Sequence, residues 1–298
     1  LIAIPSWIIG KMFPVVGGAG IAILAGMIIA MFWNEISACL KNISLPYDLV
    51  VTLVENDSKT IENIKGFKSD ARIEIVENRG FDVAPFIKVM RENDLSRYDF
   101  VIHLHSKRDV ADTLGNVVLK DPKQWRRLLL NFCSSAQNWQ RTLKTFHDNP
   151  KTGMVADRVC ILSERFDPTP EMCSAAKDYL TEYLKMPLKK AVFVSGTMFM
   201  ARSELFKPLV EKVSFDDFEP TKRQDFLTLG HIFERVFGYI VYSQDYEISD
   251  FAGRNWRVFP ARLCPTPFLI RLKNSVFRFV FQKKTDKKGN TLIKVFKI

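Results

Sequence analysis

Short apolar runs rich in β-branched residues alternate along this chain with segments whose apolar residues recur at helical spacing. Residues 47–54, 71–76 and 98–105 are expected to be strands, because β-branched side chains pack well on a pleated surface. A strand that alternates with helices points to parallel pairing, since each parallel connection needs a crossover segment. The sequence therefore predicts an α/β fold with a mostly parallel central sheet flanked by helices.

Local signals predict where several helices begin. Residues 56–58 supply short polar side chains that suit the N-cap of a helix over 59–67. Pro85 stands near the first turn of the next helix, where proline is tolerated. A long amphipathic helix is expected to start at Gln124. The other expected elements are a strand over 151–156, a strand over 191–194 and a helix over 225–237.

The run from Met12 to Trp33 holds 22 residues and no charged side chain, which meets the length criterion for a membrane-spanning helix. Its glycines and Pro14 make it a poor helix former. The alternative is a buried strand over 21–25 followed by a helix from Phe32. We favour this alternative, because a parallel sheet needs a buried first strand. Residues 1–19 stay unassigned, and residues 20–250 are expected to form the main domain.

Positive charge is concentrated near the C-terminal end of the chain. Residues 254–298 hold twelve Lys and Arg against one acid, Asp286, so their net charge is +11. The formal net charge of the whole sequence is +10, so the preceding residues sum to −1. Cations interleaved with aromatic residues suit an anionic membrane surface, and a solvated amphipathic strand pair explains the pattern equally well. No recognition motif for nucleic acid accompanies the charge. We therefore expect residues 251–298 to be a basic extension that contacts membrane and not nucleic acid.

Polar residues follow the expected strands, at the edge where ligands bind in open α/β sheets. Asn78, Arg79, Gly80 and Asp82 stand between a strand and a helix. Glycine permits a tight turn there, and the start of the helix offers free backbone N–H groups to an anion. Asp82 can equally serve as a cap for the helix alone.

The next strand ends in His103, His105, Ser106 and Lys107. The two histidines share a face of the strand, but no acid cluster accompanies them, and a metal site is not favoured. Ser and Lys side chains suit diphosphate oxygens, and neutralising a leaving group lowers the barrier to its transfer. The alternative without a binding role is a buried histidine beside an exposed lysine.

The five cysteines are scattered along the sequence and lack CxxC spacing. This pattern indicates buried thiols and a reducing compartment.

Two further segments offer candidate site residues. Gly196 and Thr197 follow an expected strand, where small residues let a substrate approach the backbone. His231, Glu234 and Arg235 lie at spacings of three and four, so they share one face of a helix. This group either lines a site or forms an ordinary surface ion pair.

Carboxylates gather in the loop over 215–219. Asp217 and Glu219 are candidates for a base that deprotonates an acceptor hydroxyl. Acidic loop residues are more often simply solvated, so their role depends on what lies near them.

Taken in order, these segments resemble the rhamnan synthesis protein F family. The resemblance spans about residues 20 to 240 and rests on the landmarks Tyr47–Thr52, Asn78–Phe86, His103–Lys107, Trp125–Arg126, Gly196–Phe199 with Arg202, and His231–Arg235. It implies a GT-A-like nucleotide-sugar transferase fold and a role in assembling rhamnose-containing cell-surface polysaccharide. It also implies a deoxythymidine-diphosphate-rhamnose donor, a lipid-linked glycan acceptor, and a peripheral position at the cytoplasmic face of the bacterial membrane.

On this resemblance we expect an inverting glycosyltransferase. The expected catalytic residues are Asp217 or Glu219 as the base, with Glu234 and Arg235 near the leaving group or acceptor. The expected donor-binding residues are Asn78, Arg79, Gly80, Asp82, His103, His105, Ser106, Lys107, Gly196, Thr197 and His231. Where many GT-A enzymes hold a divalent metal with Asp-x-Asp, this chain has His103-Leu-His-Ser-Lys, so no metal or other cofactor is expected.

The chain departs from the family pattern after its first expected strand. Family members tend to carry a histidine followed by an aromatic-aromatic-proline turn there, whereas this chain has Gly26-Met-Ile-Ile-Ala30. If that turn binds the donor, the chain is a degenerate homologue that binds sugar or glycan without turnover. A membrane-associated scaffold protein is the second alternative.

Overall fold

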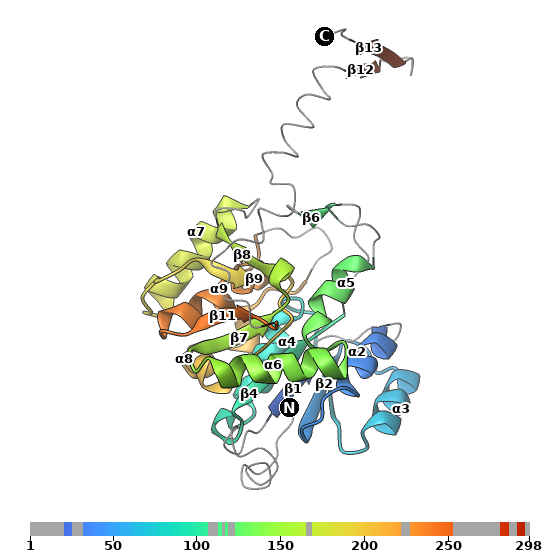
Figure 1. Ribbon diagram of the computed structural model, residues 1–298, viewed down its shortest axis with the longest axis vertical. Helices are drawn as coiled ribbons and strands as arrows, with labels where there is room; N and C mark the ends of the chain where they lie inside the picture. The colour runs from blue at the N-terminus through green and yellow to red at the C-terminus, as the bar shows by residue number, and fades with distance from the viewer. Residues whose placement is uncertain are drawn as a thin grey trace.

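The computed structural model describes residues 21–25, 32–106, 113–114, 117–118, 123–164, 169–221, 227–252, 281–285 and 291–295. A seven-stranded sheet forms the centre of the molecule, with strand order β11-β7-β10-β4-β1-β2-β3 (Figure 1). Its strands are β1 (Ile21–Ala25), β2 (Tyr47–Leu53), β3 (Arg72–Ile75), β4 (Phe100–Leu104), β7 (Thr152–Ala156), β10 (Phe199–Arg202) and β11 (Glu247–Asp250).

Helices and smaller strand pairs complete the described part of the chain. The helices are α2 (Trp33–Leu40), α3 (Ser58–Phe67), α4 (Val83–Arg91), α5 (Gln124–Leu129), α6 (Ala136–Asp148), α7 (Pro170–Asp178), α8 (Lys207–Lys212) and α9 (Leu229–Ser243). The additional strands pair antiparallel as β5 (Thr113–Leu114) with β6 (Val117–Val118), β8 (Ile161–Ser163) with β9 (Val192–Val194), and β12 (Phe281–Thr285) with β13 (Thr291–Val295).

The central sheet is mixed. β1 is parallel to both β2 and β4, β2 is parallel to β3, and β11 is parallel to β7. β10 is antiparallel to both of its neighbours, β4 and β7. The α/β fold is as predicted, but the expectation of a mostly parallel sheet did not anticipate β10. The chain enters β10 from the edge at which β4 and β7 end, after the small β8–β9 pair, and therefore runs back in the opposite direction.

The uncharged run near the N-terminus contributes a strand to the sheet. Residues 21–25 form β1, which pairs on one side with β2 and on the other with β4, so the strand interpretation is confirmed for these residues. Its two neighbours are buried, with Val51 and Val101 fully inaccessible. Among the described residues, no helix has both the length and the apolar character that crossing a membrane requires.

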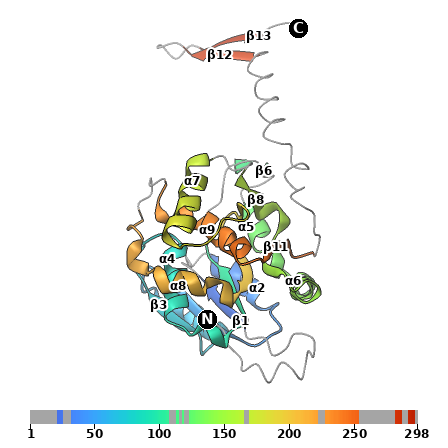
Figure 2. The same ribbon diagram turned by 90° about the vertical axis from the view of Figure 1, so that its left-hand side faces the viewer.

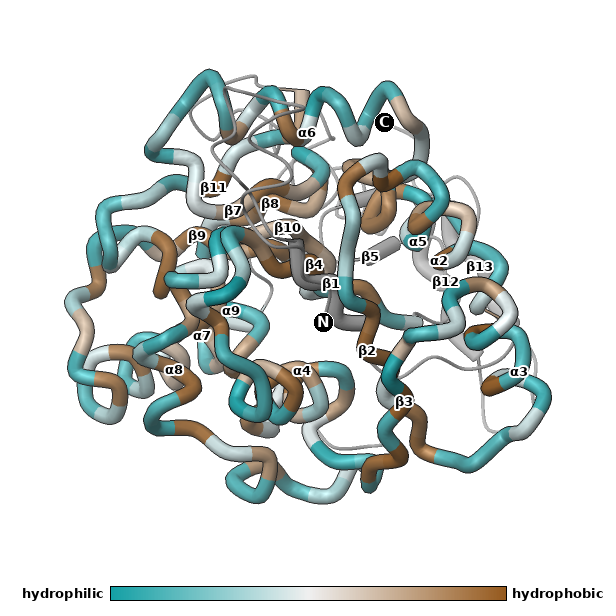
Figure 3. Tube along the Cα trace, turned by 90° about the horizontal axis from the view of Figure 1, so that it is seen from below, coloured by the Kyte–Doolittle hydropathy of each residue, from teal (hydrophilic) through white to brown (hydrophobic). Residues whose placement is uncertain are grey.

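Helices cover both faces of the sheet. Seen from below in Figure 3, α4, α7, α8 and α9 lie on one side of the strands and α2, α3, α5 and α6 on the other; Figure 2 shows the same layers from the side. The apolar side chains of α2 are buried, since Ile36 and Leu40 are each 1% exposed. Asp57 caps α3 by accepting a hydrogen bond from the Thr60 backbone N–H, as the polar residues at 56–58 suggested.

Two helix predictions need correction. The long helix expected from Gln124 is broken, because α5 ends at Leu129 and α6 begins at Ala136. Ser135 causes the second start: its hydroxyl accepts a hydrogen bond from the Asn138 N–H at 3.1 Å and caps α6. The helix expected over 225–237 begins only at Leu229 and continues to Ser243.

The core between the sheet and α9 is aromatic. The rings of Phe86, Phe199, Phe206 and Phe237 contact one another with centroid separations of 5.5 to 6.0 Å. All four are at most 1% exposed. Burying each such side chain contributes on the order of 1.5–3 kcal/mol. This cluster fixes the position of α4 and α9 against β10.

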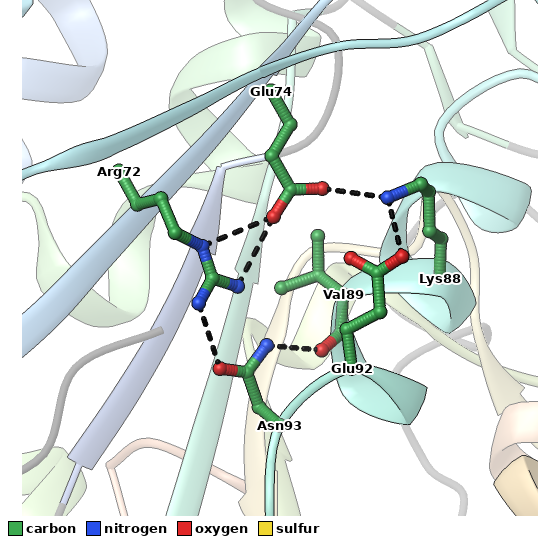
Figure 4. A network of polar contacts seen from close by, with 6 residues as sticks. All are labelled: Arg72, Glu74, Lys88, Val89, Glu92 and Asn93. Carbon is green, nitrogen blue, oxygen red and sulfur yellow. Dashed lines mark hydrogen bonds and ion pairs between the residues drawn. The ribbon is translucent and has the colours of Figure 1, made fainter.

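Charged side chains tie β3 to α4 (Figure 4). Glu74 accepts hydrogen bonds from Arg72 at 3.1 Å and from Lys88 at 3.0 Å, and Lys88 also pairs with Glu92. Arg72 reaches Asn93 at the end of α4. Partly exposed pairs contribute less than about 1 kcal/mol each, so the network chiefly sets the direction in which the chain leaves β3 and enters α4.

Four of the five cysteines lie among the described residues. All four, Cys39, Cys133, Cys160 and Cys173, are free and buried, which confirms the prediction of buried thiols at these positions. Burial raises the pKa of the Cys133 and Cys160 thiols well above the ordinary value. They therefore behave as small apolar side chains.

The basic segment over 254–298 is described only in its β12–β13 hairpin. That hairpin agrees with the strand-pair interpretation of its sequence.

Candidate functional site

The segment after β3 makes a tight turn into α4. Gly80 has φ +56°, a left-handed conformation that favours glycine. A Cβ atom at Gly80 would lie 2.6 Å from the Phe218 ring and 2.8 Å from Ala84. The turn therefore requires glycine both for its backbone angle and for the close packing of Phe218.

A second loop pairs with this turn along its backbone. The Gly80 N–H donates to the Glu219 carbonyl at 3.1 Å, and the Thr221 N–H donates to the Asn78 carbonyl at 2.7 Å. The Phe81 N–H donates to the Thr221 hydroxyl at 3.1 Å. The loop over 218–221 is thereby fastened to the turn, although the two are about 140 residues apart in the sequence.

Arg79 strengthens the pairing of the two loops. Its guanidinium donates to the Phe218 carbonyl at 2.6 Å and to the Glu77 carboxylate at 3.0 Å, and it lies 5.9 Å from the centre of the Phe215 ring. Arg79 therefore joins the two loops, in addition to the donor-binding role expected from the sequence.

Three polar side chains meet where β4 ends and β10 begins. The Thr197 hydroxyl donates to Asp82 Oδ2 at 2.5 Å. His105 Nε2 lies 3.1 Å from the Thr197 hydroxyl and 3.5 Å from Asp82 Oδ2. His105 and Thr197 are buried, while 13% of the Asp82 side chain is exposed. Three separate sequence motifs thus converge on one point at the edge of the sheet, and Asp82 is the member that reaches the surface.

Both ring nitrogens of His105 face backbone carbonyls. Nδ1 lies 2.8 Å from the Ser106 oxygen and Nε2 lies 2.8 Å from the Gly196 oxygen. A neutral imidazole has one N–H and can donate to only one of them, whereas the protonated ring donates to both. The ring is in either case held firmly between β4 and the turn before β10.

His103 belongs to the core beneath this cluster. It is fully buried and stacks on Phe86 with a centroid separation of 4.1 Å. Burial lowers the pKa of His103 to about 3, and the Asp82 carboxylate, 3.9 Å from Nε2, opposes this shift. The ring is therefore neutral at physiological pH.

The turn before β10 has an unusual backbone. Gly196 and Thr197 both have positive φ angles, +82° and +56°, and a β-branched residue rarely adopts this conformation. A Cβ at Gly196 would lie 2.6 Å from Leu129, so glycine is required. The turn directs the Thr197 hydroxyl toward Asp82.

Glu234 and Arg235 on α9 support the same turn. The Gly196 N–H donates to Glu234 Oε1 at 2.6 Å, and the other carboxylate oxygen pairs with Arg235. Arg235 also donates to the His231 carbonyl and to the Thr169 hydroxyl, each at 3.1 Å. The ion pair is largely buried, since the Glu234 and Arg235 side chains are 20% and 7% exposed. Of the helix face predicted from the sequence, Glu234 is therefore the residue directed at Gly196.

Other expected site residues lie around this cluster. His231 Nδ1 is hydrogen-bonded to the Thr228 hydroxyl at 2.8 Å, and the His231 ring packs against the Phe81 ring with a centroid separation of 4.8 Å. Glu219 is exposed, and its carboxylate accepts a hydrogen bond from the Leu229 N–H at 3.3 Å. Asp217 caps a short 3₁₀ turn by accepting from the Ser214 N–H at 2.7 Å.

The structure does not place every candidate. Asn78 lies beside the cluster, and its side-chain oxygen is buried without a hydrogen-bond partner among the described residues. Lys107 and the segment Gly26–Ala30 fall outside the described residues. In the described ranges, no group of three or more His, Cys, Asp or Glu side chains is arranged to hold a metal ion.

Two contacts near the site were not anticipated from the sequence. Thr221 joins the two loops, and Arg126 makes a two-pronged ion pair with Glu35 at 2.8 and 3.0 Å. The Arg126 guanidinium lowers the pKa of Glu35, and the pair joins α5 to α2. Glu35 and Arg126 are 91 residues apart, and no local pattern signals such a pairing.

Comparison with known proteins identifies the family. The family described as rhamnan synthesis protein F matches residues 7–246 of this chain. The chain belongs to the rhamnan synthesis protein F family. The match confirms the resemblance found from the motifs, and it includes every residue of the cluster around Asp82.

Curated relatives of this family member include the protein WxcX from two strains of Xanthomonas campestris pv. campestris. Each is 29% identical to it over 225 residues, which make up 72% of this chain and 30% of the relative. The chain thus spans about 30% of the length of the curated relatives it matches.

Solved structures resemble the chain at a lower level. A mycobacterial protein is 12% identical with a TM-score of 0.38, covering 98% of this chain and 89% of its own. Glucosyl-3-phosphoglycerate synthase from Mycobacterium tuberculosis, in complex with Mn²⁺, uridine diphosphate and phosphoglyceric acid, is 12% identical with a TM-score of 0.33, covering 97% and 90%. Similarity at this level carries no activity over to this chain.

Proposed function

We propose that this chain is a glycosyltransferase that moves rhamnose or a related sugar from a nucleotide-diphosphate donor to a growing cell-surface polysaccharide. The observation that carries the proposal is the convergence of Asp82, His105 and Thr197 at one edge of the sheet. Ligands of open α/β sheets bind at the carboxyl ends of the strands. Membership of a family described by rhamnan synthesis supplies the class of product.

The donor lies across the carboxyl ends of the parallel strands from β3 to β4 in this proposal. Asp82, whose side chain is 13% exposed and is the most accessible of the three, accepts hydrogen bonds from sugar or ribose hydroxyl groups, and Asn78 lines the same end of β3. The diphosphate lies beyond β4, next to His105, Ser106 and Lys107. Positive charge at the diphosphate stabilises the leaving group as the glycosidic bond to it breaks. Deoxythymidine-diphosphate-rhamnose is the donor that we propose.

Glu219 is the stronger of the two candidates for the base. Its backbone is hydrogen-bonded to Gly80, and its carboxylate is exposed at the start of α9. The Asp217 carboxylate is instead engaged in a local cap. A base at Glu219 would remove the proton from the acceptor hydroxyl as that oxygen attacks the sugar, with inversion at the anomeric carbon.

The described residues at the end of β4 do not fit a divalent cation. His103 is buried beneath the cluster, and both nitrogens of His105 lie against carbonyl oxygens. Divalent cations that bind diphosphates prefer carboxylate and other oxygen ligands. We therefore propose a metal-independent reaction. Transfer activity that disappears with EDTA and returns with added Mn²⁺ or Mg²⁺ would contradict this part of the proposal.

We further propose that the basic segment over 254–298 attracts the chain to an anionic membrane surface. Twelve cations against one acid suit the inner leaflet of a bacterial membrane, where a lipid-linked glycan acceptor would lie. Co-sedimentation with anionic vesicles but not with neutral vesicles, lost in a chain that ends at residue 253, tests this part.

Thermal unfolding with a panel of nucleotides and nucleotide-sugars tests the function. Deoxythymidine diphosphate and its rhamnose conjugate are expected to raise the melting temperature of the wild-type chain, and Asp82→Asn is expected to abolish the shift. Lys144→Ala, at a 71% exposed position on α6, is the matched control and should retain it. Release of sugar from the donor then separates a transferase from a homologue that only binds. No shift with any nucleotide would refute the proposal.

A further inference from the structure

We propose that Glu234 is a positioning residue: its carboxylate holds the Gly196–Thr197 turn in place, and it does not contact the substrate. The effect of Glu234 on activity rests on the proposed function, whereas its effect on the Gly196–Thr197 turn does not. This positioning role revises the expectation, drawn from the family resemblance, that Glu234 is a catalytic residue near the leaving group or acceptor.

Both oxygens of the Glu234 carboxylate are engaged within the chain. Oε1 accepts the Gly196 N–H at 2.6 Å, and Oε2 pairs with Arg235. A hydrogen bond to a charged acceptor is stronger than one between neutral groups. The carboxylate is thus committed to the backbone of the turn from one side and to its counterion from the other.

The turn that Glu234 holds has a demanding geometry. Gly196 and Thr197 are both left-handed, and a β-branched residue keeps such a conformation only when its surroundings enforce it. The Gly196 N–H bond to Glu234 enforces it from α9. On the other side, the Gly196 carbonyl lies 2.8 Å from His105 Nε2 and the Thr197 hydroxyl donates to Asp82. One carboxylate on α9 therefore sets two contacts of the cluster at the sheet edge.

Arg235 serves this arrangement as a counterion. Its guanidinium contacts Glu234, the His231 carbonyl and the Thr169 hydroxyl, and it stacks 4.7 Å from the centre of the Phe193 ring. A guanidinium that is 7% exposed and held on several sides is poorly placed to bind a diphosphate. Its guanidinium binds Oε2 of Glu234 and leaves Oε1 directed at the Gly196 N–H.

Three variants separate positioning from direct catalysis. Glu234→Ala removes the acceptor of the Gly196 N–H. Glu234→Gln keeps an acceptor oxygen at the same distance but removes the charge. The double variant Glu234→Gln/Arg235→Met keeps the acceptor and removes both charges of the pair, while the Met side chain continues to pack on Phe193.

The first readout is the Gly196 amide itself, followed by NMR chemical shift and hydrogen exchange. Exchange is expected to quicken at least about tenfold in Glu234→Ala, because a hydrogen bond to a charged group is lost. Exchange should be slower in Glu234→Gln than in Glu234→Ala, because the amide oxygen still accepts the bond, although without the charge. This readout needs no ligand, so it stands even if the proposed function fails. An unchanged Gly196 amide in Glu234→Ala overturns the inference.

The second readout is affinity for deoxythymidine diphosphate, followed by sugar transfer. Glu234→Ala is expected to lose at least about tenfold in affinity or in kcat/KM, whereas Glu234→Gln and the double variant recover most of the loss. The pH profile of kcat should not move in Glu234→Gln. Loss of activity in Glu234→Gln with an unchanged Gly196 amide would make Glu234 a catalytic group, and loss of diphosphate affinity in the double variant alone would place Arg235 on the ligand.

Discussion

Replacement of His103 by leucine is expected to weaken the pH dependence of stability on the acid side. His103 is fully buried and stacks on Phe86, and burial lowers its pKa from 6.5 to about 3. In the unfolded chain the same imidazole takes up a proton near pH 6.5. Unfolding therefore binds one proton at any pH between these two values, and that proton favours the unfolded state.

The sign and size of the effect follow from this difference. A histidine whose pKa is lowered by folding costs no stability above about pH 6.5, and it destabilises the folded state increasingly as the pH falls toward 3. Each pH unit in that window removes about 1.4 kcal/mol. The loss is about 2 kcal/mol between pH 7 and pH 5 and approaches about 5 kcal/mol over the whole window.

Urea unfolding of wild type and His103→Leu at pH 7, 6 and 5 measures this directly. Leucine has a similar volume and does not titrate, so from pH 7 to pH 5 the unfolding free energy of wild type should fall by about 2 kcal/mol more than that of His103→Leu. Phe86→Leu is the matched control: it removes the stacked ring but keeps the imidazole, so it should be destabilised at every pH with the wild-type pH slope. Asp82→Asn, introduced into both wild type and His103→Leu, removes any contribution from the neighbouring carboxylate.

Parallel loss of stability in wild type and His103→Leu across this range would refute the reasoning. It would mean that the folded chain binds the proton at His103 as readily as the unfolded chain does.

Three further outcomes are expected. Gly80→Ala should lower the free energy of unfolding by about 1–3 kcal/mol, because its Cβ would lie 2.6 Å from the Phe218 ring; Gly66→Ala in α3, where a Cβ meets nothing within 4 Å, should instead be neutral or stabilising. Ser135→Ala should cost about 1 kcal/mol in urea unfolding through loss of the α6 cap, and an unchanged midpoint would contradict the capping role. Asp82→Asn should reduce sugar transfer by at least about 100-fold, measured with saturating donor; activity near wild type would remove Asp82 from the site.

Elements with a complete local signal were predictable from the sequence. β2, β3 and β4 each carry a β-branched run, and the cap of α3 is visible at Asp57. The break between α5 and α6 also had a local signal in Ser135, which an amphipathic pattern running on from Gln124 obscured. β10 was not predicted, because the residues after the expected strand over 191–194 were interpreted as a segment that a substrate approaches and not as a turn into a further strand. The left-handed turn at Gly196 and Thr197 depends on contacts with residues distant in the sequence, so local propensity does not predict it.

The residue types of the site were predictable, but their partners were not. Asp82 and Thr197 are 115 residues apart, and no spacing rule relates them. The same holds for the contact of Glu234 with the Gly196 backbone, because the helix-face pattern indicates which residues share a surface and not what that surface meets. Arg79 looked like a ligand-binding cation, whereas its guanidinium donates hydrogen bonds to the Phe218 carbonyl and the Glu77 carboxylate of the adjoining loops.

The long sequence separations in the site bear on how the chain folds. Contacts across 115 to 140 residues carry a large loop-closure cost, which slows their formation relative to local structure. During synthesis, β3, α4 and β4 emerge well before Thr197, the partner of Asp82, and Glu219, the partner of the Gly80 N–H. Until those residues arrive, Asp82 and the backbone of Gly80 must be satisfied by water. The turn between β3 and α4 is therefore among the last parts of the molecule to become rigid.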